Sequence, residues 1–274
     1  MSPLSAQIIS IITASILLLG IGWPIVMRRM GIKPHAPMGI SPTGFDRRDV
    51  LIGFFFLLFY GITPLTAFLS KDAANAETTL TVGQIIGKIM VQAFATAAVF
   101  MRLLSRDLKP HAGWNRFISL KQVGLILIAV ISPFICLNLM NLTGIVEWIA
   151  QKTDSSIFQD SVEQLRTGSL SVKLALAISA VICAPFIEEL VFRGYLYPLL
   201  KKFTGPVFSC IMTSLLFGIV HMNLIMLIPL SLMGVLLVLV YERTKSIWAP
   251  ITVHIIFNLI TVVNILFIEP KFLS

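Results

Sequence analysis

A succession of long apolar runs constrains this chain more than any other feature. About 20 apolar residues in a helix span the hydrocarbon core of a bilayer, and the 274-residue sequence offers about eight such runs. They lie at residues 4–27, 50–69, 81–101, 123–144, 173–200, 205–222, 224–241 and 247–268. The runs therefore predict an all-α, polytopic bundle of about eight transmembrane helices.

The composition agrees with a membrane protein. Hydrophobic residues make up 57% of the chain and charged residues only 12%, whereas a soluble domain is about 25% charged. Cys136, Cys183 and Cys210 all lie in apolar runs without a CxxC motif, so we interpret them as small hydrophobic residues. The run 4–27 lacks a basic leader and an evident cleavage site, and we expect a retained helix there.

Charge in the loops predicts the orientation of the bundle. The net charge is +8, and the loops 28–49 and 102–122 carry five basic residues each, whereas the loops 70–80 and 145–172 do not share this excess. The positive-inside rule places the two basic loops in the cytoplasm and, with eight spans, both termini outside. Four further basic residues then also fall inside: Lys201, Lys202, Arg243 and Lys245. Since this pattern explains the basic charge, we expect no nucleic-acid partner.

Ionisable side chains inside apolar runs mark the candidate functional site. A charge in hydrocarbon is costly and usually functional. Six ionisable residues are not accounted for by the loops and the polar helix ends: Lys88, Glu188, Glu189, Arg193, His221 and His254. Five of the six fall in the last third of the chain, so the site is predicted there.

The two adjacent glutamates are predicted to be unequal. Glu189 and Arg193 are four residues apart, so they share a helix face and form an ion pair in the favourable order. Glu188 points about 100° away and has no counter-ion in its own helix. Pro185 removes a helical hydrogen bond just upstream and can admit water beside Glu188. Glu188 then suits a general base; the alternative is a purely structural ion-pair cluster.

Two further motifs supply donors and a second base. His254 and Asn258 share a helix face and can stabilise an oxyanion, although helix–helix hydrogen bonding is an alternative role. His221 on another helix can help Glu188 to deprotonate a water, although a lone histidine near a helix end is more often an interfacial or core residue. Zinc bound by Glu188, His221 and His254 is conceivable from the ligand types, but the spacing does not demand it. Neither a G-x-S-x-G nor an H-E-x-x-H motif occurs.

These residues resemble the motifs of a known family. The segments E-E-x-x-F-R-G at 188–194, F-x-x-x-H at 217–221 and H-x-x-x-N at 254–258 look like those of the CAAX-protease and bacteriocin-processing (Abi) family, also called type II CAAX prenyl endopeptidases. The flanking segment 243–250 is similar too, and the resemblance covers roughly residues 175–260.

The resemblance implies a glutamate-type intramembrane endopeptidase. By position, Glu188 and His221 would activate the attacking water. His254 and Asn258 would stabilise the oxyanion, and Glu189 and Arg193 would support the site. We expect catalysis without a cofactor, with the metal site above left open.

The expected organisation places four spans without a motif in residues 1–170 and the catalytic core in residues 171–268. We expect a multi-pass protein of the cell membrane that contacts lipids and cleaves a membrane-embedded or lipid-anchored protein or peptide. One alternative is a non-enzymatic bacteriocin-immunity or scaffold protein. A proton-coupled transporter is less favoured, because no inverted repeat is evident.

The predicted topology leaves a difficulty of depth. His221 falls near the outer end of its span, whereas Glu188 lies about 13 residues, or roughly 20 Å, from the inner loop. His254 lies only about seven residues from the inner end of its own span. A shared water therefore requires one helix to be broken, tilted or entered late, and Pro185 and Pro206 are candidate positions for this.

Overall fold

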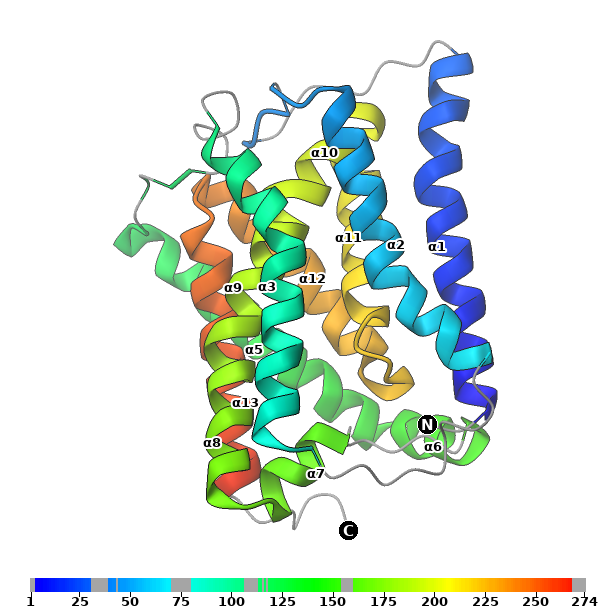
Figure 1. Ribbon diagram of the computed structural model, residues 1–274. Helices are drawn as coiled ribbons and strands as arrows, with labels where there is room; N and C mark the ends of the chain where they lie inside the picture. The colour runs from blue at the N-terminus through cyan, green and yellow to red at the C-terminus, as the bar shows by residue number, and fades with distance from the viewer. Residues whose placement is uncertain are drawn as a thin grey trace.

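The structure is a computed structural model that describes residues 3–30, 39–42, 44–69, 80–105, 113–114, 116, 118–153 and 160–267. Within those residues the chain is helical and contains no β-strand (Figure 1). The first half contains α1 (Pro3–Arg29), α2 (Arg47–Leu69), α3 (Val82–Leu104), the 3-10 turn η2 (Leu120–Gln122), α5 (Val123–Leu142), α6 (Ile145–Thr153) and α7 (Asp160–Thr167). The second half contains α8 (Leu170–Ile178), η3 (Ser179–Cys183), α9 (Ala184–Glu189), η4 (Leu190–Leu196), α10 (Tyr197–Thr204), α11 (Pro206–Ile219), α12 (Leu224–Thr244) and α13 (Trp248–Phe267).

Helices occupy all the predicted apolar runs, which confirms the all-α bundle. Five helical segments are long and apolar enough to cross a membrane: Val82–Leu104, Val123–Leu142, Leu170–Thr204, Leu224–Thr244 and Trp248–Phe267. Leu4–Gly20 and Pro206–Ile219 are apolar but shorter, and the side chains of residues 61–69 in α2 lie outside the described part. The number of about eight full crossings is therefore not confirmed and stays a prediction.

Large apolar side chains point outward from these helices. Phe94 of α3 is 86% exposed and Leu142 of α5 is 84% exposed. Soluble monomers rarely expose extended apolar patches, whereas the hydrocarbon of a bilayer requires such a surface. The chain is accordingly an integral membrane protein.

The segments predicted to be cytoplasmic meet at one end of the bundle, the upper end in Figure 1. Lys201 Nζ donates to the carbonyl of Ile40 over 2.7 Å and forms a 2.6 Å ion pair with Glu242 of α12. Ser246 Oγ donates to the carbonyl of Arg116 over 2.6 Å. These contacts confirm that the turns after α10 and α12 lie on the side of the two basic loops. Several basic residues of those loops, among them Lys33, Arg106 and Lys109, lie outside the described residues.

The other end of the bundle holds the beginning of α1 and the short helices α6 and α7 (Figure 1). Ser5 Oγ of α1 donates to the carbonyl of Thr153 at the end of α6 over 2.6 Å. The last helix, α13, runs from the basic end to this end. The beginning of α1 and the end of α13 therefore lie on the same side, as an even number of crossings requires.

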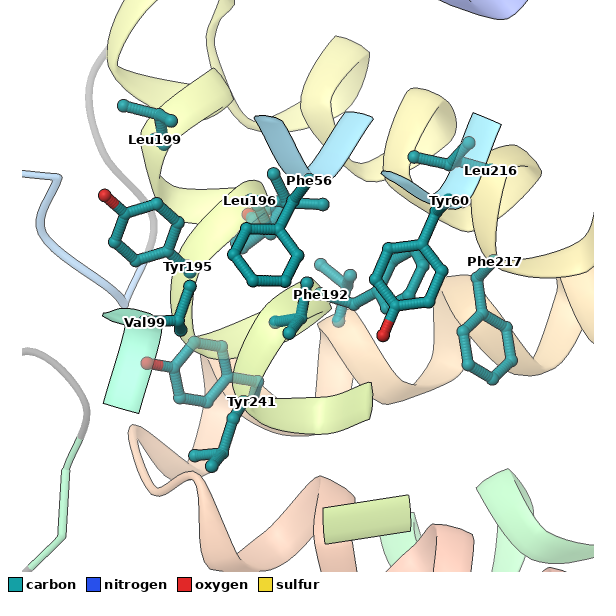
Figure 2. Packing of buried hydrophobic residues seen from close by; sticks show 14 of the residues in the cluster. Phe56, Tyr60, Val99, Phe192, Tyr195, Leu196, Leu199, Leu216, Phe217 and Tyr241 are labelled. Carbon is teal, nitrogen blue, oxygen red and sulfur yellow. The ribbon is translucent and has the colours of Figure 1, made fainter. Parts of the chain in front are cut away.

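One hydrophobic core joins the two halves of the chain (Figure 2). Phe56 of α2 and Val99 of α3 pack in the same cluster as Phe192 of η4 and Phe217 of α11, and none of the four is exposed to solvent. The segment that carries the glutamates is therefore held by helices from both halves. The predicted division of the chain near residue 170 stays a prediction.

Candidate active site

Two π-helical turns flank the short helix that carries both glutamates. The segment from α8 to α10 is continuous, but η3 (Ser179–Cys183) and η4 (Leu190–Leu196) are π-helical, with α9 (Ala184–Glu189) between them. π-turns inside α-helices are rare and frequent at functional sites. Pro185 lies at the start of α9 and lacks the N–H that a regular turn would use. The distortion expected at Pro185 is thus a widened turn and not a break.

Glu189 accepts hydrogen bonds from two side chains, those of Arg193 and His254. Arg193 Nη1 donates to Glu189 Oε1 over 2.8 Å, which confirms the predicted pair four residues apart. His254 Nδ1 of α13 lies 3.0 Å from the same oxygen. Because a carboxylate accepts hydrogen bonds, Nδ1 carries the proton and Nε2 is left on the opposite side of the ring. The three side chains are all buried, so the charge of Glu189 is compensated inside the bundle.

Arg193 connects this pair to two more helices. Its Nη2 donates to the carbonyl of Gly234 in α12 over 3.2 Å. Its guanidinium lies over the ring of Phe217 in α11, 4.4 Å from the centroid, a favourable cation–π distance. Arg193 is 1% exposed. The buried cation is therefore surrounded by an acid, a carbonyl and an aromatic face, which offset the cost of its desolvation.

Glu188 has no such compensation. Its Oε2 is buried and makes no hydrogen bond to any described residue. It lies within electrostatic range of His254, Glu189 and Arg193, but the direct contacts of those cationic groups go to Glu189. Oε2 of Glu189 also makes no hydrogen bond to a described residue. The two glutamates therefore differ at Oε1, which binds Arg193 and His254 in Glu189. The predicted contrast between a paired and an unpaired glutamate is confirmed.

His221 lies two residues after the end of α11, in the turn before α12. Its Nδ1 donates to the carbonyl of Phe217 over 2.7 Å, and its ring lies 5.1 Å from the ring of Phe217. His254 lies near the same ring, since the ring centroids of Phe217 and His254 are 5.6 Å apart. Phe217 therefore brings both motif histidines and Arg193 around one aromatic ring.

The short length of α11 removes the difficulty of depth. The helix has 14 residues, or about 21 Å at 1.5 Å per residue, which is less than the hydrocarbon thickness of about 30 Å. It begins near the basic end and stops inside the bundle, so His221 does not reach the outer surface. The apolar run 205–222 thus contains a short helix followed by a turn, and not one full-length span.

Close packing of α11 against α12 holds this turn in place. A Cβ atom on Gly234 would lie 2.8 Å from Cα of Ser214, and one on Gly218 would lie 2.9 Å from the carbonyl oxygen of Leu227. Both distances are too short for real Cβ contacts, so the two helices approach as closely as glycine permits. Any larger residue at either position would move His221 or the carbonyl that binds Arg193.

Asn258 makes a contact that the sequence did not reveal. Its Nδ2 donates to the carbonyl of Ala180 in η3 over 2.7 Å. In the π register the carbonyl of Ala180 would accept from residue 185, just as the carbonyl of Ser179 accepts from Ala184. Residue 185 is proline and has no N–H, so Asn258 replaces the missing donor. An amide has two hydrogens, and the second is the one that an oxyanion role would use.

A buried network at the basic end supports η4. Arg102 of α3 binds Asp49 of α2 with both Nε (2.8 Å) and Nη2 (2.9 Å), and the hydroxyl of Tyr195 donates to Asp49 Oδ1 over 2.7 Å. Asp49 is 0% exposed. Sequence reasoning missed this site because Asp49 lies at a predicted loop boundary, where acids are common. The network links the N-terminal helices to the π-turn that carries Arg193.

Five of the six predicted site residues therefore lie on α9 and η4 or around the ring of Phe217, and Asn258 contacts the preceding turn η3. Among the residues that the structure describes, no group of three or more His, Cys, Asp or Glu side chains converges as metal ligands would. The conceivable zinc ligands Glu188, His221 and His254 do not form such a group. Metal dependence itself stays a matter for experiment.

Comparison with known proteins agrees with the motifs. Residues 170–260 match the family described as "Type II CAAX prenyl endopeptidase Rce1-like", so the expected family resemblance is confirmed for this part of the chain. All three motifs lie inside the matched range. No solved structure matches the chain.

Two curated relatives match a longer part of the chain. "Putative membrane peptidase YdiL" of Bacillus subtilis (strain 168) is 30% identical over 155 residues, which cover 54% of this chain and 59% of that protein. "UPF0177 protein YvdC" of Lactococcus lactis subsp. lactis (strain IL1403) is 27% identical over 156 residues, which cover 56% of this chain and 55% of that protein. The matches thus span little more than half of each relative, and they support a membrane protease in general terms.

Proposed function

We propose, starting from the Rce1-like character of residues 170–260, that this protein is an intramembrane endopeptidase that hydrolyses a peptide bond with a water activated by Glu188. The observation that carries this proposal is the unequal pairing of the two glutamates. Arg193 and His254 both bind Oε1 of Glu189, whereas Glu188 is half-buried and its buried Oε2 has no partner among the described residues. A general base needs a carboxylate that is free to take a proton, and Glu188 satisfies this condition.

In the proposed reaction the water oxygen attacks the carbonyl carbon of the scissile bond, and its proton passes to Glu188. His221 assists from the opposite side. Its Nδ1–H is fixed on the carbonyl of Phe217, which places the lone pair on Nε2, where it can accept a hydrogen bond from the same water. The leaving amine then takes the proton back from Glu188.

The negative charge that develops on the carbonyl oxygen needs donors. His254 is oriented by Glu189, which can stabilise a positive charge on the imidazole, so that Nε2–H donates to the oxyanion. The second amide hydrogen of Asn258 is the other candidate donor. Arg193 keeps Glu189 in place and contributes positive potential without touching the substrate.

The substrate class follows from the position of the site. The glutamates and His254 lie in helical segments long and apolar enough to cross a membrane, and His221 lies in the turn after the apolar helix α11, so the proposed substrate is a membrane-embedded or lipid-anchored protein or peptide. We place the enzyme in the cell membrane as a multi-pass protein, with its basic end in the cytoplasm and its outer helix faces in contact with lipid. The proposed reaction uses no cofactor.

Peptidomics of membranes tests the proposal. Membranes with the wild type are compared with those holding Glu188→Ala at equal protein abundance, and Glu147→Ala, an exposed acid of α6, is the matched control. Peptides cleaved with the wild type and with Glu147→Ala, but absent with Glu188→Ala, support an endopeptidase. Identical peptide sets in all three would contradict it. Bacteriocin immunity conferred equally by Glu188→Ala would favour the non-enzymatic alternative.

A further inference from the structure

Tyr60 of α2 carries a buried hydroxyl without a partner. The residue is 9% exposed, and its Oη makes no hydrogen bond to any part of the chain that the structure describes. Its ring is held firmly, 6.3 Å from the ring of Phe56 and 5.2 Å from that of Phe192. In Figure 2 Tyr60 lies between Phe56 and Phe217, and its hydroxyl points in the same direction as the Phe217 ring. A donor buried in this way needs an acceptor.

The packing of Tyr60 places it on the Glu188 face of the motif helix. Phe192 follows Glu188 by four residues, so the two side chains lie on one face. The neighbouring face, with Glu189 and Arg193, is turned toward α12 and α13. Because Tyr60 packs on Phe192, α2 lies against this face of the helix one turn after Glu188. Tyr60 and Glu188 are also within electrostatic range of each other.

Tyr60 Oη and Glu188 Oε2 are thus a donor and an acceptor that are both buried, on the side of the motif helix that Tyr60 packs against, and neither has a hydrogen-bond partner among the described residues. One small polar group between them satisfies both, because it can accept from the phenol and donate to the carboxylate. Water has this chemistry, and buried waters typically bridge such groups. It is also the co-substrate of the proposed hydrolysis.

We propose that Tyr60 is a further residue of the site, whose hydroxyl positions the attacking water against Glu188. This inference rests on the proposed function. The phenol donates its hydrogen to the water oxygen, and the water donates one hydrogen to Glu188 Oε2. During attack the water oxygen bonds to the carbonyl carbon and that hydrogen moves to Glu188 as a proton. Tyr60 keeps its own proton throughout.

Tyr60→Phe tests the role, because it removes the hydroxyl and keeps the ring that packs on Phe56 and Phe192. The probe is a membrane peptide that the wild type cleaves and Glu188→Ala does not. We expect kcat to fall about tenfold or more, as for loss of one catalytic hydrogen bond, with KM within about twofold. We expect the melting temperature to change little, since the packing of the ring is kept and only a hydrogen bond to one water is lost.

Tyr197→Phe is the matched structural control, since the Tyr197 hydroxyl binds Glu242 over 2.7 Å. It lowers the melting temperature and leaves kcat per folded molecule unchanged. If Tyr60→Phe behaves like this control, or if its kcat equals that of the wild type, the proposed role of Tyr60 is wrong.

A second measurement is independent of peptidase activity. The melting temperatures of the full chain in detergent are compared for Tyr60→Phe, Glu188→Gln and the double variant. Groups that share one bridging partner are coupled, so the change in the double variant differs from the sum of the single changes by about 2 °C or more. Additive changes overturn the bridge. If the wild type cleaves nothing, the proposed function is wrong. The comparison of melting temperatures still shows whether Tyr60 and Glu188 interact through a shared partner.

Discussion

Asn258 donates a 2.7 Å hydrogen bond to the carbonyl of Ala180, the carbonyl that Pro185 cannot serve. The third motif of the chain is thereby joined to the π-turn that precedes the first motif. Since His254 on the same helix binds Glu189, α13 holds the glutamate segment at two points, before and at the end of α9. The first and third motifs are thus held together by direct hydrogen bonds, and both belong to the candidate site.

The contact between Asn258 and Ala180 predicts a stability change that depends on Pro185. Asn258→Ala leaves the carbonyl without a donor and should lower the free energy of unfolding by about 1–3 kcal/mol. In a Pro185→Ala background the amide of residue 185 can serve that carbonyl, so the loss should shrink. Thermal unfolding in detergent measures both. Asn138→Ala is the control, because Asn138 Nδ2 bonds a carbonyl of its own helix; equal losses in both backgrounds would refute the assignment.

Replacement by glutamine should lower the stability of the protein at Glu189 but not at Glu188. Glu189→Gln leaves Arg193 and His254 buried without their counter-charge, and breaking a buried pair costs about 3–5 kcal/mol. We expect this variant to melt at a clearly lower temperature or to accumulate poorly. Glu188→Gln should melt like the wild type, since no ion pair is lost. Glu163→Gln is the control. Glu163 and Arg166 form an ion pair at the surface with 3.9 Å between the charged atoms, and its loss should cost less than about 1 kcal/mol of stability. Equal melting of Glu188→Gln and Glu189→Gln would contradict the unequal pairing.

The buried network at Asp49 should be essential for stability although it lies far from the motifs in sequence. Asp49→Ala removes the acceptor of Arg102 and Tyr195 and should cost about 3 kcal/mol or more. Tyr195→Phe removes only one hydrogen bond and should cost about 1 kcal/mol. Arg48→Ala, whose side chain is 80% exposed, should change the melting temperature little. If Asp49→Ala melts like Arg48→Ala, the N-terminal helices do not support η4 through this network.

Cleavage should not depend on a bound metal. The residues predicted as conceivable ligands do not converge in the described part of the chain, and the proposed reaction activates water with Glu188. Dialysis against a strong chelator should therefore leave the cleavage rate within about twofold of the untreated enzyme, a change of less than 0.5 kcal/mol in the barrier. Loss of activity after dialysis, with recovery on addition of zinc, would refute metal-free catalysis.

The parts of the fold that depend on local sequence were predictable. Apolar runs of about 20 residues located the helices because the bilayer demands them. The pair of Glu189 and Arg193 followed from their spacing on one helix. The basic loops identified the end of the bundle at which Lys201 and Glu242 meet.

The missing parts depend on long-range contacts or on departures from regular helix. The sequence spacing could not show that His254 turns to Glu189, because the two lie 65 residues apart. It could not show that α11 ends early, since the apolar pattern continues to His221. The π-turns were equally hidden, and with them the reason why Asn258 bonds Ala180. Tyr60 escaped notice because a tyrosine in an apolar run is ordinary until its hydroxyl proves to be buried and unbonded.

The most direct measurement compares the cleavage rates of Glu188→Gln and the wild type in membranes, normalised to folded protein. The substitution preserves size and removes the charge that accepts the proton. Loss of a general base lowers rates by about 10²–10⁴-fold, and we expect a loss in this range with unchanged abundance and melting temperature. Cleavage by Glu188→Gln at the wild-type rate would contradict the proposed role of Glu188 as the base.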